Sequence, residues 1–149
     1  MTKKVKFAAI AMATIGLLWV GCTAPTAEVR SADLRSLTLQ QLDVGLTLDL
    51  KNPNEFSIPV EAIDWGLSLF DTSVADGRAQ PDAEIAANSS TDVDVPISLR
   101  LSDLSQTASR VASSSLIPWA IGGTCHFDIP TGSVAVDFSR DGEWDNPLR

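Results

Sequence analysis

The chain has 149 residues, of which 44% are hydrophobic and 20% charged, and a formal net charge of −8 at neutral pH. This composition fits one folded domain of ordinary size and excludes a disordered polyanion. The acidic balance argues against nucleic acid as a partner, because a negative surface repels the phosphate backbone.

Residues 1–21 have the pattern of an export signal. A start with three lysines precedes an apolar run from Phe7 to Val20, which is shorter than the roughly 20 residues that a membrane-spanning helix needs. An uncleaved transmembrane anchor is therefore the weaker interpretation. Gly21-Cys22 at the end of the run resembles a bacterial lipobox, which implies that Cys22 becomes the first mature residue and carries lipid. The alternative is an ordinary exported protein, with Cys22 in the signal or in a disulfide.

The residues after Cys22 set the expected compartment and the first domain boundary. Thr23 follows Cys22 where an aspartate would signal retention, and by resemblance to sorted lipoproteins this implies the outer membrane, facing the periplasm. Cleavage removes three lysines and no acid, which leaves 8 basic and 19 acidic residues and a net charge near −11. Residues 23–33 are small and polar and lack periodicity, so we predict a flexible tether over residues 22–33 and a domain over residues 34–149.

The strictest periodicity of the chain lies at residues 42–50. Leucine or valine occupies every second position, which predicts a half-buried strand, and Pro53 in Asn52-Pro53-Asn54 ends it because proline has no N–H to donate. We interpret Asn52 and Asn54 as turn-formers rather than ligand binders. Leu37 and Leu39 precede this strand in the opposite phase, so we expect a bulge or corner at Gln40-Gln41.

The middle of the chain predicts further strands. Ile58 and Val60 alternate in one phase and the apolar residues from Ile63 to Leu69 in the other, so we expect a kink near Ala62, with Trp65 facing the core. After a turn at residues 71–73, a weak edge strand is expected at residues 74–79, followed by a loop over most of residues 80–90. A second strong strand follows at residues 93–101, where Pro96 lies on the outward face.

The carboxyl-terminal third predicts one helix and a hairpin. Residues 102–116 carry a helical stripe, and we expect Gly122-Gly123 to turn the chain into a strand at residues 124–129. Pro130-Thr131-Gly132 predicts a turn into a returning strand through Phe138. The chain therefore predicts an all-β fold: an immunoglobulin-like or fibronectin-III-like antiparallel β-sandwich of about seven strands with one short helix.

Several landmarks occur in a characteristic order. They are Leu46 to Asn54, Ile58-Pro59-Val60, Trp65 to Leu69, Ala75-Asp76-Gly77, Val95 to Leu99 and Ile129 to Gly132. Together they resemble the water-stress and hypersensitive-response (WHy) domain of the late embryogenesis abundant type 2 family, over residues 34–144. The Cys125-His126-Phe127 segment departs from the family at a position often held by an aromatic residue. The resemblance implies a folded sandwich, membrane-anchored in bacteria and associated with desiccation tolerance, without catalytic residues.

Candidate chemical groups are few. Cys125 alternates with Phe127 and Ile129, which indicates a small buried side chain rather than a reactive thiol, and His126 is interpreted as a solvated strand residue. Two acidic pairs leave a weak calcium site as an alternative to solvated charge; they are Asp92 with Asp94 and Asp141 with Glu143. No hydrolase or phosphate-binding motif occurs, so we predict no enzyme, no cofactor and no catalytic, cofactor-binding or metal site.

The sequence thus predicts a non-catalytic lipoprotein, anchored through Cys22, that protects envelope components during water or osmotic stress. We expect it to be a monomer that does not bind nucleic acid. The alternative is an interaction module or scaffold in which a sheet edge or loop end binds one envelope protein.

Overall fold

The strand expected at residues 42–50 is the centre of the first sheet in a computed structural model that describes residues 23–104 and 106–149. This strand, β2 (Gln41–Asn52), lies between β1 (Thr26–Leu37) and β6 (Ser89–Arg100), and both pairings are antiparallel. Because β6 is an edge strand, Pro96 can occupy it without removing a hydrogen bond from the interior of the sheet.

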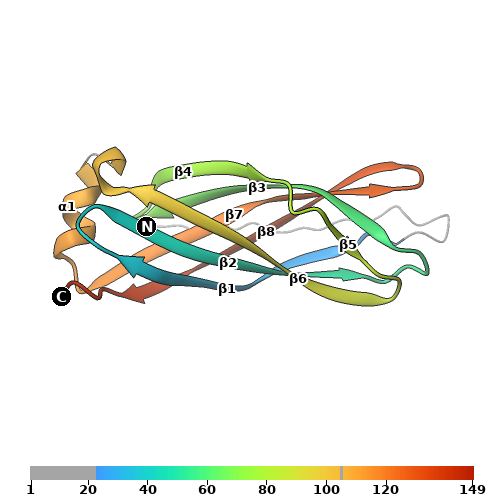
Figure 1. Cartoon of the computed structure of the whole chain (residues 1–149), viewed down its shortest axis with the longest axis horizontal. Coiled ribbons are helices and arrows are strands. Elements are labelled where there is room, and N and C mark those ends of the chain that lie inside the picture. Colours follow the sequence, from blue (N-terminus) through green and yellow to red (C-terminus); the bar gives the residue numbers. More distant parts are fainter. Residues whose placement is uncertain (1–22, 105) are drawn as a thin grey trace.

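The second sheet has the order β4–β3–β7–β8, with the short strand β5 pairing with the other end of β3 (Figure 1). The strands are β3 (Ile58–Leu69), β4 (Thr72–Ala79), β5 (Ala83–Ile85), β7 (Leu116–Ile129) and β8 (Gly132–Asp145). A register shift between Val60 and Ala62 confirms the predicted kink. The described chain is therefore an antiparallel β-sandwich, as predicted, with eight strands where about seven were expected.

The core lies between the two sheets. Alternation in β2 directs five side chains inward, each at most 1% exposed: Leu42, Val44, Leu46, Leu48 and Leu50. Opposite them, β3 and β7 contribute Ile63, Leu67, Cys125 and Phe127. Burial of each large apolar side chain stabilises the fold by about 1.5–3 kcal/mol, so the alternating strands supply most of the driving force.

Two different structures close the ends of the sandwich. At one end, the 3-10 helix η2 (Leu101–Leu104) and the helix α1 (Gln106–Ser113) cover the core with Leu104 and Val111 (Figure 1). At the other end lie the β2–β3 corner and the β7–β8 turn. The helix was predicted across an open end, and there it lies, although it is shorter than residues 102–116.

The predicted flexible tether is wrong over the described residues 23–33, because Thr23 is hydrogen-bonded to Asn54, Pro25 is buried and β1 begins at Thr26. Ala27, Val29 and Ala32 are buried against the core, and bulges between Val29 and Ser31 and between Leu34 and Ser36 shift the phase twice. Small apolar residues and two bulges hide the alternation that would have indicated a strand.

One smaller prediction also needs correction. Gly122-Gly123 is no turn, since β7 runs unbroken from Leu116, and a Cβ at Gly123 would lie 1.8 Å from the Asp64 carbonyl oxygen. The glycine therefore permits close approach of β3 rather than a reversal. The expected corner before Gln41 is confirmed, and Leu39 is exposed there; Trp65 faces the core, as expected, and is half-buried.

A buried aromatic pair lies instead at the β1–β8 side of the sandwich. The rings of Trp119 and Trp144 stack with centroids 5.4 Å apart, and Trp144 Nε1 donates to the Ala32 carbonyl at 2.8 Å. Arg140 Nη1 donates to the carbonyls of Val29 and Arg30 at 3.0 and 2.9 Å. These bonds tie β8 to the first bulge of β1 and join the two sheets along this side.

Candidate functional site

Buried amide side chains hold the Asn52-Pro53-Asn54 corner. Asn52 is 1% exposed, and its Nδ2 donates to the carbonyls of Phe56 at 2.7 Å and of Ile85 at 3.1 Å. Its Oδ1 accepts the backbone N–H of Asn54 at 2.9 Å. Since a buried polar group is costly to leave without a partner, these bonds select one geometry and fasten the corner to β5.

Asn54 fastens the start of the described chain to the same corner. Its Nδ2 donates to the Thr23 carbonyl at 2.6 Å, and its Oδ1 accepts the Thr23 N–H at 2.7 Å. The side-chain amide of Asn54 thus pairs with the backbone of Thr23 in the way that a residue of a neighbouring strand would. The predicted turn at Asn52 and Asn54 is confirmed, but the sequence did not reveal the contact with Thr23, which lies 31 residues away.

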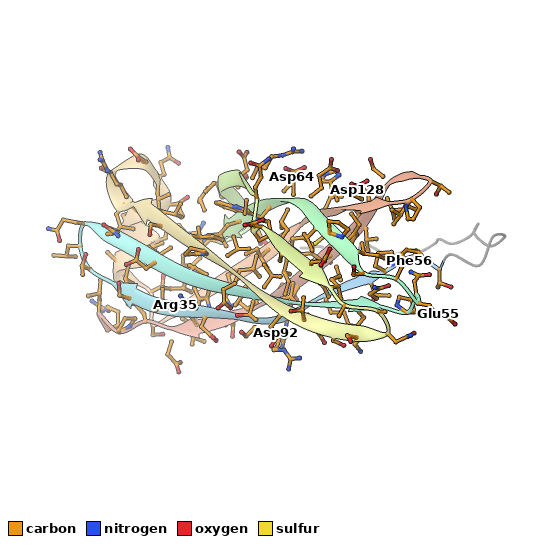
Figure 2. The ribbon with its side chains drawn as sticks, turned by 45° about the vertical axis from the view of Figure 1, so that its right-hand side comes forward. Arg35, Glu55, Phe56, Asp64, Asp92 and Asp128 are labelled. Carbon is orange, nitrogen blue, oxygen red and sulfur yellow. The ribbon has the colours of Figure 1, made fainter. Side chains whose placement is uncertain are left out.

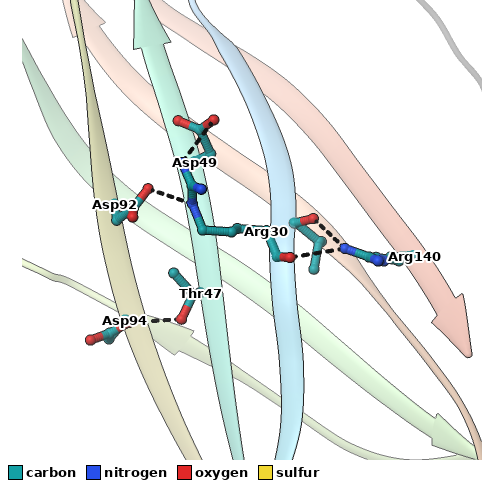
Figure 3. A network of polar contacts seen from close by, with 7 residues as sticks. Arg30, Thr47, Asp49, Asp92, Asp94 and Arg140 are labelled. Atoms are coloured by element: carbon teal, nitrogen blue, oxygen red, sulfur yellow. Dashed lines mark hydrogen bonds and ion pairs between the residues drawn. The ribbon is translucent and has the colours of Figure 1, made fainter. Parts of the chain in front are cut away.

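Charged and polar residues cross the outer face of the first sheet (Figure 3). Arg30 of β1 donates through Nε to Asp92 of β6 at 3.0 Å, and its Nη2 lies 3.4 Å from Asp49 of β2. Thr47 donates to Asp94 at 2.8 Å. Asp92 and Asp94 therefore have protein partners, and residues 23–104 and 106–149 contain no group of three or more metal-ligating side chains.

The same face continues toward the helical end through Asp43. Its carboxylate accepts the hydroxyls of Ser36 at 2.8 Å and Ser98 at 2.7 Å, and the amide of Gln41 at 2.8 Å. The bonds from Gln41, Ser98 and Ser36 lower the pKa of Asp43, because they stabilise its charged form. All three strands of the sheet are thus linked across a hydrated, charged surface.

His126 lies on the outward face of β7 and is partly exposed, in line with its interpretation as a solvated strand residue, and its ring also contacts a surface ion pair on the second sheet. Its Nε2 lies 2.8 Å from Asp64 Oδ2, and Arg78 donates to both oxygens of the same carboxylate at 2.7 and 3.1 Å. Asp64 is labelled in Figure 2. Arg78 first, and then His126, lower the pKa of Asp64 below its ordinary value. The cluster joins β3, β4 and β7 at the surface.

Comparison with known proteins identifies the family. The family model described as late embryogenesis abundant protein, LEA_2, matches residues 47–142, which is more than half of the chain. The chain belongs to the LEA_2 family. A desiccation-related protein of Arabidopsis thaliana is 25% identical over 120 residues, which cover 80% of this chain and 72% of the relative. The late embryogenesis abundant protein Lea14-A of Gossypium hirsutum is 22% identical over 120 residues, with 80% of each chain covered.

A solved structure of an LEA_2-like protein supports the fold. The solution structure of a late embryogenesis abundant protein of Arabidopsis thaliana superposes with a TM-score of 0.68 at 24% identity, covering 83% of this chain and 72% of the other. At this identity the likeness concerns the fold. The LEA_2 match begins inside β2 and ends inside β8, so it includes the Asn52–Asn54 corner and the Asp64 cluster, while β1 and Thr23 lie before it.

The structure describes one of the two cysteines of this LEA_2 chain. Cys125 is fully buried, as predicted, and desolvation raises the pKa of its thiol to about 12, so it stays protonated and unreactive at neutral pH. Cys22 lies outside the described residues. Over residues 23–104 and 106–149, no helix has the length and apolar character to cross a membrane. Proteins of this family are generally non-enzymatic.

Proposed function

We propose that the chain is a non-catalytic protective protein of the WHy type that acts during desiccation or osmotic stress, held at a membrane by lipid on Cys22. The observation that carries the proposal is membership of the LEA_2 family together with a relative named for desiccation. The resemblance of Gly21-Cys22 to a lipobox supports the anchor.

The proposed mechanism rests on the contrast between core and surface. The two sheets bury their large apolar side chains against each other, whereas their outer faces carry carboxylates linked by hydrogen bonds to neighbouring strands. The mature chain carries 19 acidic and 8 basic residues, so like charge keeps copies of the protein and acidic partners apart. As water is lost, such a hydrated surface separates neighbouring proteins by charge and excluded volume, without a specific pocket.

Drying a test enzyme with the purified protein examines this function directly. The enzyme should keep more activity with the protein than with an equal mass of serum albumin. A matched variant, Glu28→Gln with Asp76→Asn and Asp141→Asn, removes three exposed charges that make no ion pair among the described residues. It should fold normally and protect less. Equal protection by the wild-type protein, the triple variant and albumin would refute a mechanism based on charge.

The anchor needs a separate test. Metabolic labelling with a fatty-acid analogue should label the wild-type protein in the membrane fraction, whereas the Cys22→Ser protein should be unlabelled and leave that fraction. We place the protein at the outer membrane, facing the periplasm, because Thr23 and not an aspartate follows Cys22. An unlabelled and fully soluble wild-type protein would refute the anchor and leave the sandwich unaffected.

An interaction module is the second candidate, and the position of β4 favours it. This strand lies at an edge of the second sheet, and its residues are exposed or half-buried. An exposed edge can pair with a strand of another protein. Crosslinking in intact envelopes should then enrich one partner protein. Replacement of residues 75–79 should abolish this crosslink, whereas the same replacement made in β8 should leave it intact. Loss from both variants, or from neither, would contradict this reading.

A further inference from the structure

The first described residue is already fixed to the body of the sandwich. Both backbone polar groups of Thr23 are bonded to the side chain of Asn54, at 2.7 Å for the N–H and 2.6 Å for the carbonyl. Pro25 is buried, and β1 begins at Thr26. The position next to Cys22 is thus held at the β2–β3 corner, which Figure 2 marks with Glu55 and Phe56.

We infer that the Asn54 clamp makes the protein stand end-on, with the β2–β3 corner facing the bilayer and the helical end pointing away. The inference rests on the proposed lipid at Cys22. Cys22 and Thr23 are joined by one peptide bond, so their Cα atoms lie about 3.8 Å apart. An unstructured tether of about ten residues would instead span roughly 17 Å on average and would leave the orientation free.

The length of the strands sets how far the other end reaches. β1 and β2 have 12 residues each and run between the corner and the helical end. At about 3.3 Å per residue, a strand of this length spans about 40 Å. The elements η2 and α1 therefore lie about that far from the corner, at the end opposite the anchor (Figure 1).

The chemistry of the two ends decides how deep the corner sits. Glu55 is exposed at the corner, and Asp128 is exposed near the end of β7. Carboxylates are costly to bury in hydrocarbon, so the corner rests on the head groups, and the lipid supplies the affinity. Among the described residues, the exposed large hydrophobic side chains are Leu39, Leu116 and Leu148. They lie toward the helical end, in the β1–β2 turn, at the start of β7 and after β8.

Labels at the two ends test the orientation. Glu55→Cys and Asp103→Cys each remove one exposed acid, one at the corner and one in η2, so the two proteins have the same charge. The mature acylated proteins, which begin at Cys22, are labelled with a fluorophore and placed in phosphatidylcholine vesicles that carry a head-group quencher. The buried thiol of Cys125 does not compete for the label. The Glu55→Cys label should be quenched several-fold more strongly than the Asp103→Cys label.

A tether variant provides the matched control. Ten Gly/Ser residues inserted between Cys22 and Thr23 leave the clamp intact and restore slack, so the difference in quenching should largely disappear. Equal quenching of the two labels in acylated, vesicle-bound protein without the insert would overturn the end-on orientation alone. Protein that is not acylated and does not float with vesicles would overturn the proposed anchor, and the orientation with it.

Discussion

Replacement of Asn52 by alanine should destabilise the protein through the corner it holds. The side chain donates to the carbonyls of Phe56, Ile85 and Ala86 and accepts two bonds from Asn54. A hydrogen bond contributes about 1 kcal/mol net, and a buried group left without a partner costs about 1–3 kcal/mol. The Ile85 bond is fully buried, whereas the carbonyls of Phe56 and Ala86 can reach water. We therefore expect a loss of about 3 kcal/mol.

Urea denaturation of the purified protein measures this loss as a change in the free energy of unfolding. Gln80→Ala is the control, because Gln80 is exposed and its side chain makes no hydrogen bond within the described structure; it should change stability by less than about 0.5 kcal/mol. Asn52→Asp keeps the acceptor but loses the donors and buries a charge, so it should be at least as harmful as alanine. An alanine variant as stable as the control would refute the view that the buried amide holds the corner.

Three further predictions concern the second sheet. Gly123→Ala should cost about 2–3 kcal/mol, because its Cβ would lie 1.8 Å from the Asp64 carbonyl oxygen, whereas Gly66→Ala, with 3.9 Å to its nearest neighbour, should be neutral or stabilising in the same denaturation assay. Folding lowers the pKa of Asp64 below its ordinary value of 3.8. The contribution of the ionised Asp64 to stability is therefore complete above pH 3.8, and it is lost as the pH falls through the pKa of the folded state. Asp64→Asn should therefore lose less stability than wild type during acid titration, and parallel curves would contradict the ion-pair cluster. The Cys125 thiol should react with a disulfide reagent only after unfolding, and fast reaction of the native protein would contradict its burial.

The sequence predicted the parts of the fold in which large side chains alternate without interruption. β2 and β6 were located because leucine, isoleucine and valine repeat at every second position. β1 was missed because alanine carries part of its inner face and two bulges change the phase. The first half of β7 was missed because Gly122-Gly123 was interpreted as a turn, although it lies within a continuous strand.

The contacts of the candidate site were harder to predict from the sequence, because they join residues that lie far apart in the chain. Asn52 and Asn54 were recognised as a turn, but the bond to Thr23 spans 31 residues and that from His126 to Asp64 spans 62. Periodicity reports which face of a strand a residue occupies, and it does not report register between strands. The pairing of β3 with β7 therefore had to be known before His126 could be placed beside an acid.

Survival after drying measures whether the protein protects the cell that makes it. Three strains are compared: one lacking the protein, one with the wild-type gene restored, and one with the Cys22→Ser gene expressed at the same level. The wild-type gene should restore survival and the Cys22→Ser gene should restore less, because the folded domain is then present but no longer held at the membrane. Survival of the strain lacking the protein at the wild-type level would contradict a protective function.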